Sequence, residues 1–484
     1  LRSTKLLTQQ KINDIHIAFV SDTMWTDVVY VTLLLFCVFV GFYYRKIEDP
    51  EVKKWTGTFI GILLTGVVSG SYILFPLIFS LINAIIITNI SPKKSHIVSF
   101  IFSFFFLLVI SRLGDYIGLP VPSTHTNLIL MILTLKLSGL AFELNAAINP
   151  PADDPEGVDN EAIKNVGFLD VFHYGFGYMG LLTGPYYRYR TYWDHLYRPF
   201  SKVVDPWPVT LHKLKQTTFF IVLFFIMNYC YPVRYILTEE YAERSFLYRH
   251  SYMYPTFVLF RVRMYIGMGL AECGCQMAGL GAYPTRCKPI QGLGPKDYKT
   301  TETLAKTPEK LENEELDFET VYNMNVWKLE KCNSTRTAMK TWNNCVQYWF
   351  GVYIYKRLPM KNMRALLTLL LSAVWHGWSA GYAVCFCQIP LFLLSEDIFY
   401  KFYQQAAENS IARKLWYLLG WYEKTTCMAY LGISFLVLDF KETLAYYKLV
   451  YFSGHIIALT LYIAALYCKL YIFKKPTGDK DKDK

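Results

Sequence analysis

The sequence predicts an all-α fold, a polytopic membrane bundle of about ten to eleven transmembrane helices. Of its 484 residues, 53% are hydrophobic and 17% are aromatic, whereas only 18% are charged. Soluble domains carry about a quarter charged residues. Apolar runs of about 20 residues, long enough to cross a bilayer, recur along nearly the whole chain. The segments between these runs are too short for a sizeable soluble domain.

The individual spans follow from these runs. The apolar stretch 56–90 is too long for one helix and is interrupted by Gly70, Ser71 and Pro76, so we expect a hairpin of two helices there. The other spans are expected near residues 24–44, 96–112, 124–142, 166–184, 216–233, 253–283, 363–394, 411–438 and 448–472.

The net charge of +11 comes from short basic clusters beside the spans. Arg45, Lys46, Lys53 and Lys54 follow the first span, so we expect the loop 45–54 to be cytosolic and the N-terminus to be luminal. Such clusters suit contacts with anionic lipid headgroups. No basic stripe with interleaved aromatic residues lies outside the apolar segments, which argues against nucleic acid as a partner. The sequence identifies no protein partner.

Four segments lie outside the predicted spans. Residues 1–23 lack the basic end and continuous apolar core of a signal peptide, and we expect them to extend outside the fold. The acidic loop 143–165 and the charged tail 474–484 are expected to be solvated; the last five residues of this tail resemble a K-x-K-x-x retrieval signal for the endoplasmic reticulum. Residues 285–340 are expected to form a mobile loop or a surface helix, and they include the glycosylation sequon Asn333-Ser334-Thr335.

The cysteines indicate neither a disulfide framework nor a metal site. They are odd in number, 11, and most lie within spans. The pairs Cys273/Cys275 and Cys385/Cys387 lack the matching second pair that a structural zinc site needs. The chain also has no P-loop and no G-x-S-x-G motif, which disfavours a nucleotide site and a serine hydrolase. We therefore expect no metal and no bound cofactor.

One ionisable residue, His376, lies within the apolar stretch Leu369–Leu391, flanked by Trp375 and Gly377. An ionisable side chain in a span is costly and is by default a functional candidate. The structural alternative is a core histidine that is hydrogen-bonded to a serine one turn away, Ser372 or Ser379. Small residues surround the histidine. They either leave space for a substrate tunnel or let neighbouring helices pack closely.

The segment 341–359, TWNNCVQYWFGVYIYKRLP, precedes the histidine and is expected to be an aromatic helix at the membrane interface. In a helix, Asn343 and Gln347 would share one face. The alternative is an aromatic belt helix with an incidental amide. An amide and an imidazole are nevertheless the groups that acyl transfer needs. The imidazole can take a proton from an attacking hydroxyl, and the amide can hold the acceptor or donate to the oxyanion.

The motif W-N-x-x-V-Q at Trp342–Gln347, followed by S-A-V-W-H-G at Ser372–Gly377, resembles the signature of the membrane-bound O-acyltransferase family. The resemblance runs from about residue 24 to about residue 470 and implies one acyltransferase domain over 24–473. It implies that His376 and Asn343 are the catalytic pair, with His376 as the general base. Asn344 directly follows Asn343, and we choose Asn343 because it follows the motif's tryptophan.

Two further stretches, LLTGPYYRYRTYWDHL at 181–196 and FRVRMYIGMGLAECGCQMAGLGAYP at 260–284, are similar to the lysophosphatidylinositol acyltransferase branch of this family. This similarity implies transfer of a polyunsaturated, arachidonoyl-like chain from acyl-coenzyme A, a substrate and not a cofactor, to the sn-2 hydroxyl of lysophosphatidylinositol. It also implies residence in the endoplasmic reticulum membrane.

Other residues are weaker candidates for the site. Arg188 and Arg190, interleaved with tyrosines at a membrane edge, suit either phosphate contacts to substrate or interfacial anchoring. Gln347 and Trp375 are expected to contact substrate because they lie in the two motifs. Three further ionisable residues are expected to be structural: Glu272, paired with Arg261 or Arg263, and the histidines His125 and His455.

Two alternative functions remain open. Within the family, the acceptor could be another lysophospholipid, a sterol or diacylglycerol, or a protein. From another class, a transporter could use a buried histidine to relay protons. A transporter is typically built from repeated halves with paired broken helices, and no such repeat is visible in the sequence.

Overall fold

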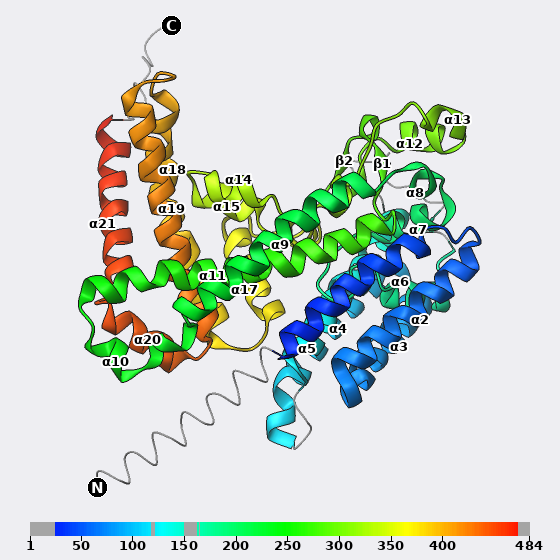
Figure 1. The fold of residues 1–484 in the computed structure, drawn as a ribbon, viewed down its shortest axis with the longest axis horizontal. Helices are drawn as coiled ribbons and strands as arrows, with labels where there is room; N and C mark the ends of the chain where they lie inside the picture. Colours follow the sequence, from blue (N-terminus) through cyan, green and yellow to red (C-terminus); the bar gives the residue numbers. More distant parts are fainter. Residues whose placement is uncertain (1–24, 118–121, 150–161, 164, 473–484) are drawn as a thin grey trace, which may run out of the picture. The chain divides into compact units, whose positions relative to one another are not determined.

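A computed structural model of the chain describes residues 25–117, 122–149, 162–163 and 165–472 (Figure 1). The predicted extension 1–23, the tail 474–484 with its retrieval-like end, and most of the acidic loop lie outside the described residues. The chain divides into two compact units, residues 1–217 with 266–323 and residues 218–265 with 324–484. Helices α9 (Trp207–Cys230) and α11 (Phe246–Met277) each contribute residues to both units.

The first unit is mainly helical. Its first helix covers Trp25–Tyr44. The others are α2 (Pro50–Ser69), the 3₁₀ turn η1 (Gly70–Ile73), α3 (Leu74–Asn89), α4 (Pro92–Ile117), α5 (Thr124–Ile148), α6 (Phe168–Phe176), α7 (Tyr189–Tyr197) and α8 (Phe200–Val203). Helix α5 is the most buried of the long apolar helices and lies at the core of this unit.

Local sequence signals explain the ends of α2. The Asp49 side chain accepts a hydrogen bond from the Val52 backbone N–H at 2.8 Å, and Pro50 occupies the first helical position, where its missing N–H costs nothing. The helix stops at Gly70, whose φ of 54° favours glycine. The predicted pair of helices within 56–90, broken near Gly70, is therefore confirmed.

The polar segment after α11 is folded and is neither a mobile loop nor a single surface helix. It contains β1 (Tyr283–Pro284) paired with β4 (Leu316–Asp317), β2 (Pro289–Ile290) paired with β3 (Gly294–Pro295), η3 (Thr285–Cys287), α12 (Tyr298–Ala305), α13 (Pro308–Leu311) and η4 (Glu319–Val321); both strand pairs are antiparallel. Apolar side chains hold it together, among them Cys287, Leu304 and Leu311, which pack with Phe200 and Tyr283. Scattered apolar residues in a Lys- and Glu-rich stretch thus form a small core.

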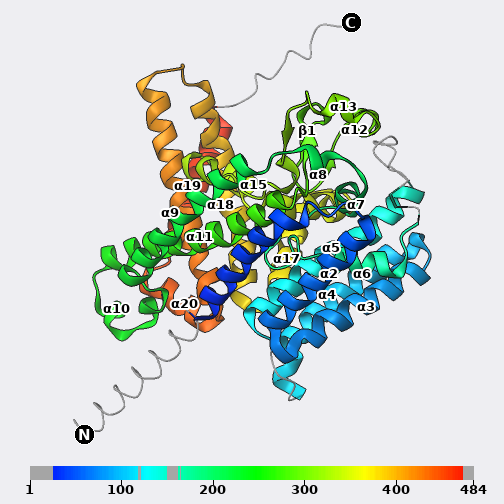
Figure 2. The same ribbon diagram turned by 45° about the vertical axis from the view of Figure 1, so that its right-hand side comes forward.

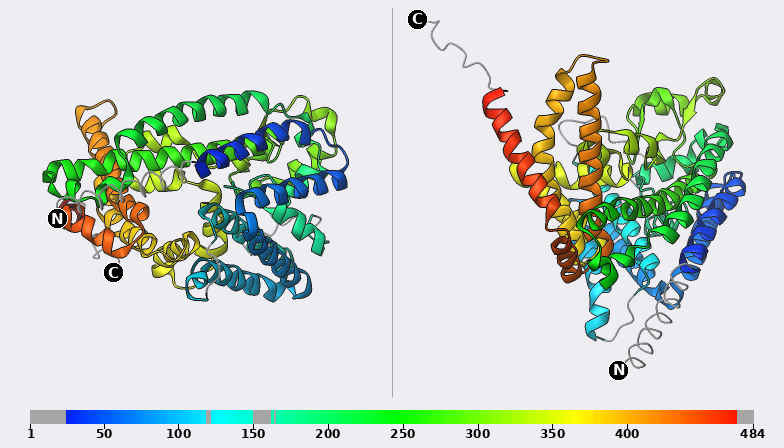
Figure 3. Two further views of the ribbon diagram at one scale, coloured as in Figure 1. Left: turned by 60° about the horizontal axis from the view of Figure 1, so that its bottom comes forward. Right: turned by 60° about the vertical axis from the view of Figure 1, so that its left-hand side comes forward.

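The second unit carries the rest of the chain (Figure 2). Its elements are η2 (Val233–Leu237), α10 (Glu239–Glu243), α14 (Val326–Lys331), α15 (Thr335–Thr341), α16 (Asn344–Trp349), the π-helix η5 (Phe350–Tyr355), η6 (Lys361–Met363), α17 (Arg364–His376), α18 (Ala380–Gln405), α19 (Ile411–Val437), α20 (Phe440–Leu449), α21 (Ser453–Tyr467) and η7 (Cys468–Ile472). Helices α18 and α19 lie side by side as an antiparallel pair (Figure 3).

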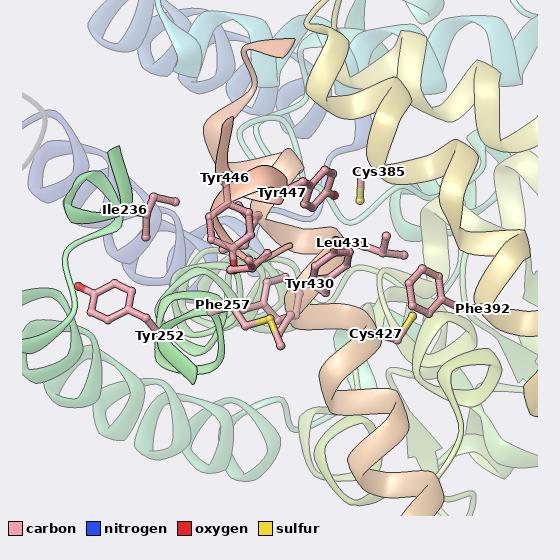
Figure 4. Close-up of a cluster of buried hydrophobic side chains, with 14 of the residues drawn as sticks. Ile236, Tyr252, Phe257, Cys385, Phe392, Cys427, Tyr430, Leu431, Tyr446 and Tyr447 are labelled. Atoms are coloured by element: carbon pink, nitrogen blue, oxygen red, sulfur yellow. The ribbon is translucent and has the colours of Figure 1, made fainter. Parts of the chain in front are cut away.

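A buried cluster joins α11, α18, α19, α20 and α21 in the second unit (Figure 4). Tyr430 lies at its centre, stacked on Tyr447 at 4.8 Å between ring centroids. Glycines allow the close approach: a Cβ at Gly432 would come within 2.3 Å of the Phe257 ring, and one at Gly454 within 2.5 Å of the Tyr430 ring. The core of this unit is therefore aromatic and packed around small residues.

The protein is a polytopic helical membrane protein, but the expected ten to eleven spans are not confirmed. Six helical stretches among the described residues are long and apolar enough to cross a membrane, with α2, η1 and α3 counted together as one stretch, or seven if the bent α18 counts as one span. The predicted span 166–184 is wrong, because α6 has only 9 residues, about 14 Å of helix at 1.5 Å per residue. An apolar run of span length was therefore a misleading signal at this position.

The serine and threonine of the sequon are buried in this fold, and its asparagine is half-buried. The side chains of Ser334 and Thr335 are 5% and 3% exposed. The Asn333 Nδ2 atom is buried and forms no hydrogen bond to any residue that the structure describes. Asn333 and Ser334 lie between α14 and α15, and Thr335 is the first residue of α15.

Candidate active site

His376 is the last residue of α17, at a break in what the sequence predicted as one continuous span over 363–394. Gly377 ends the helix with φ 135°, and its N–H donates to the carbonyls of Ala373 and Val374 at 3.2 and 3.1 Å. The chain resumes as α18 at Ala380. The break follows from Gly377, because a side chain would disfavour this backbone conformation.

Aromatic rings surround the half-buried imidazole of His376. The centroid distances are 4.8 Å to Trp375, 5.6 Å to Tyr382, 5.5 Å to Phe386 and 5.1 Å to Phe435. Across the described part of the chain, no side chain or backbone group forms a hydrogen bond with the imidazole.

The hydrogen bond to Ser372 or Ser379, expected of a purely structural histidine, is therefore absent. The nitrogens of a neutral imidazole comprise one donor and one acceptor. Both remain available to a substrate.

Asn343 lies between α15 and α16 in a left-handed backbone conformation, with φ 51° and ψ 57°. Asparagine is one of the few side chains that visit this region routinely. The Oδ1 atom of Asn343 is buried and has no hydrogen-bond partner among the described residues. A buried acceptor without a partner is costly, and functional sites are one reason that it persists. Its position makes this oxygen a candidate substrate contact.

Gln347 and Trp375 have different surroundings. The Gln347 side-chain amide donates to the backbone carbonyls of Met339 and Trp342, which closes the turn between α15 and α16. Trp375 is 4% exposed, and its ring packs against Phe350 of the π-helix at 6.0 Å. π-helical turns are rare and frequently occur at functional sites. The Gln347 amide is thus hydrogen-bonded within the protein. Trp375 connects α17, which ends at His376, to the π-helix η5, which follows α16.

A series of aromatic contacts also joins the two motifs. Trp342, next to Asn343, stacks on Phe260 at 6.3 Å, and Phe260 packs on Phe435 at 5.4 Å. Phe435 in turn contacts His376.

Sequence reasoning missed the four rings Phe260, Tyr382, Phe386 and Phe435. Tyr382 and Phe386 could have been found, because they are spaced i, i+4 just after the histidine. Phe260 and Phe435 are far from it in sequence and carry no such signal.

Arg188 and Arg190 belong to the first unit and contact carboxylates there. Arg190 Nε donates to Asp194 Oδ1 at 2.8 Å, and Arg190 Nη2 to Glu302 Oε1 at 2.5 Å. Arg188 Nε lies 3.3 Å from Glu143 Oε2. Burial of Arg190 is the largest single effect and opposes its charge, but Asp194, Tyr283 and Glu302 together outweigh it and raise the pKa of the guanidinium. Burial raises the pKa of the Asp194 carboxyl. The nearby charge of Arg190 lowers this pKa and offsets part of the rise.

The remaining ionisable candidates have protein partners. Glu272 pairs with Lys213, at 2.6 Å between Oε2 and Nζ, and not with Arg261 or Arg263 as expected. Arg261 instead binds both carboxylate oxygens of Glu330 in the second unit. His125 Nε2 lies 3.5 Å from Asp27 Oδ1, and His455 Nδ1 lies 2.8 Å from the Tyr430 hydroxyl. Both histidines thus have the polar partners that the structural interpretation requires.

Comparisons with known proteins agree with the two motifs. Residues 154–438, more than half of the chain, match the membrane-bound O-acyltransferase family. A membrane-bound acylglycerophosphatidylinositol O-acyltransferase of Drosophila melanogaster is 37% identical over 448 residues, covering 89% of this chain and 90% of the relative. The proteins of the same description from Xenopus laevis and Homo sapiens are 32% and 31% identical. These alignments cover 94% and 91% of this chain, and 96% and 93% of the relatives.

Both motifs, Trp342–Gln347 and Ser372–Gly377, lie within the matched residues. The resemblance drawn from them is therefore confirmed. The chain belongs to the membrane-bound O-acyltransferase family.

Proposed function

We propose that this protein transfers a polyunsaturated fatty acyl group from acyl-coenzyme A to the sn-2 hydroxyl of lysophosphatidylinositol, in the membrane of the endoplasmic reticulum. Similarity over about nine-tenths of the chain to several acylglycerophosphatidylinositol O-acyltransferases supports the acceptor. The observation that carries the chemistry is that neither the imidazole of His376 nor the Oδ1 atom of Asn343 has a hydrogen-bond partner among the residues that the structure describes.

In the proposed mechanism, His376 removes the proton of the sn-2 hydroxyl as its oxygen attacks the thioester carbonyl. The tetrahedral intermediate then collapses, the carbon–sulfur bond breaks, and the imidazolium returns the proton to the departing thiolate of coenzyme A. Asn343 accepts a hydrogen bond from the acceptor through Oδ1 or donates to the oxyanion through Nδ2. The thioester is already activated, so the reaction needs only a positioned base and no acyl-enzyme.

The direct test is His376→Ala in purified, full-length protein. General base catalysis is typically worth about 10²–10⁴-fold, and we expect turnover to fall by that factor while elution volume and Tm stay unchanged. The matched control is His250→Ala. This half-buried histidine of the same unit has a protein partner, Ser453, at 3.0 Å. Wild-type activity in an intact His376→Ala protein would exclude His376 as the base.

The acceptor is tested separately, with one acyl-coenzyme A and a panel of lysolipids that differ only in headgroup. We expect the inositol headgroup to give the highest kcat/KM. A higher value for another lysolipid, a sterol or diacylglycerol would reassign the acceptor within the family. Proton-coupled flux in proteoliposomes without acyl-coenzyme A turnover would instead support a transporter.

A further inference from the structure

The side chain of Glu396, on α18, is 5% exposed and binds the start of α15. One carboxylate oxygen, Oε1, accepts from the Ser334 hydroxyl at 3.0 Å and from the Arg336 backbone N–H at 3.0 Å. The other, Oε2, accepts from the Thr335 backbone N–H. The first N–H groups of a helix lack partners within the helix and carry partial positive charge. A buried carboxylate is therefore a strong anchor for them.

Helix α15 connects this anchor to Asn343. The helix has 7 residues and ends at Thr341, so it is about 10 Å long. Trp342 and Asn343 follow immediately, and the Gln347 side chain closes this turn by donating to the Met339 and Trp342 carbonyls. When the first turn of such a short helix is fixed, the last turn can move little. The position of the Asn343 amide thus depends on where α15 begins.

Helix α18 also contacts the histidine. Tyr382 and Phe386, near its start, pack on the His376 ring at 5.6 and 5.5 Å. The same helix therefore touches the imidazole near one end and binds α15 through Glu396 further along. Through these contacts, α18 sets the position of the motif Trp342–Gln347 relative to the motif Ser372–Gly377, although the two motifs are separate in sequence.

Other contacts hold the preceding helix, α14, independently of Glu396. Lys424 Nζ donates to the carbonyls of Leu329 and Glu330 at 3.2 and 3.0 Å, and Trp421 Nε1 donates to the Glu330 carbonyl at 2.9 Å. The Glu330 carboxylate is bound by Arg261. Loss of Glu396 would consequently remove the buried contacts at the start of α15 and leave the exposed Arg336–Asp397 pair there, while α14 stays attached.

We propose that Glu396 is a positioning residue for acyl transfer: by binding the start of α15, it places the Asn343 amide relative to His376. Glu396 itself touches neither reacting group. This inference rests on the proposed function, because it gives Asn343 a role in the reaction.

The test is a double-mutant cycle between Glu396→Ala and Asn343→Ala in full-length protein, with kcat and KM measured for both substrates. A displacement of about 1 Å at a reacting group can cost about 100-fold, so we expect Glu396→Ala to lower kcat by about 10–100-fold with little change in KM. In the Asn343→Ala background, Glu396→Ala should lower kcat by less than about 3-fold, because the effects of residues that act as a unit do not add.

Two further variants separate positioning from loss of fold. Asp397→Ala is the matched control: it removes the exposed ion pair to Arg336, at 2.6 Å, on the neighbouring position of the same helix. We expect it to keep wild-type kcat. Glu396→Gln keeps the shape and one acceptor oxygen, and we expect a folded protein with a smaller loss of kcat than Glu396→Ala. Partial rescue by Gln with an unchanged Tm supports positioning.

The outcomes distinguish the two proposals. If Asn343→Ala keeps wild-type kcat, the role of Asn343 in the proposed function fails, whatever Glu396 does. If Asn343→Ala is impaired but Glu396→Ala lowers kcat equally in both backgrounds, Glu396 acts independently of Asn343 and the positioning role is overturned. Wild-type kcat in either folded Glu396 variant would overturn it as well.

Discussion

The ring of Phe435 packs edge-on against the imidazole of His376, with 5.1 Å between centroids and 81° between planes. Phe435 also contacts Tyr382 at 4.8 Å and Phe260 at 5.4 Å. It thus holds the histidine ring from α19 while the α18 rings hold it from the other helix. The imidazole has no hydrogen bond to orient it within the described structure, so these aromatic contacts set its direction.

We therefore expect Phe435→Ala to reduce kcat by about 10-fold or more, since the reacting nitrogen loses its fixed direction. Phe435→Leu fills much of the volume without an aromatic edge and should be intermediate. Steady-state kinetics with KM for both substrates will show the effect. Equal kcat in the wild-type and Phe435→Ala proteins would mean that Phe435 does not orient the histidine.

Asn343 can be tested by separating its amide from its backbone conformation. Glycine adopts a φ of 51° freely, whereas alanine there costs about 1–2 kcal/mol. We expect Asn343→Gly to match or exceed the wild-type Tm and still lose most activity, because the amide is gone. Asn343→Ala should lose activity and also some Tm. Wild-type activity in Asn343→Gly would mean that Asn343 serves only the left-handed backbone conformation and takes no part in the reaction.

Gly381 tests how closely α18 and α19 approach. A Cβ there would lie 2.2 Å from the Ser434 carbonyl oxygen and 2.7 Å from the Leu438 Cα. Gly381→Ala should therefore destabilise the protein by about 1–3 kcal/mol, as overpacking does. Gly351→Ala is the control, since its Cβ would have no atom within 4 Å. Thermal melts in detergent measure both, and equal Tm values would refute the close packing at Gly381.

Arg190 distinguishes a structural guanidinium from one that binds substrate phosphate. Its pair with Asp194 is spaced i, i+4, and both side chains are 2% exposed. Removing one partner of a buried pair costs about 3–5 kcal/mol, so we expect Arg190→Ala to lower Tm sharply. The Glu240–Arg244 pair has the same spacing at 63% and 50% exposure, and Arg244→Ala should leave Tm unchanged. An unchanged Tm with a raised KM for acyl-coenzyme A would indicate phosphate binding instead.

The sequence alone predicted the helical membrane class, and it singled out His376 and Asn343 as candidates for the site. His376 stood out because an ionisable residue in an apolar run is rare, and the motifs drew attention to Asn343. The bounds of α19, Ile411–Val437, match those of the predicted span 411–438 almost to the residue, but α19 is not among the described helices that are long and apolar enough to cross a membrane. These features are local, and local patterns are what a sequence shows directly.

The rest depends on contacts between distant segments. Nothing near Glu272 in sequence indicates that Lys213 is its partner. The break after His376 depends on one glycine in an otherwise continuous apolar run. The folded segment after α11 forms because scattered apolar side chains meet Phe200, far upstream. Hydropathy cannot detect such contacts, because it averages over neighbours in sequence.

Because α17 ends at His376, the imidazole also lies in the electrostatic field of the helix C-terminus. The peptide dipoles of a helix add up to a partial negative charge of about half an elementary charge at its C-terminal end. His376 is the last residue of α17 and therefore lies at that end. A cationic imidazolium, formed as the acceptor hydroxyl loses its proton, would be stabilised there by about 0.3–1 kcal/mol. Gly377 ends the helix at this point. The negative helix end therefore stabilises the imidazolium in part, whereas no carboxylate contacts this ring among the described residues.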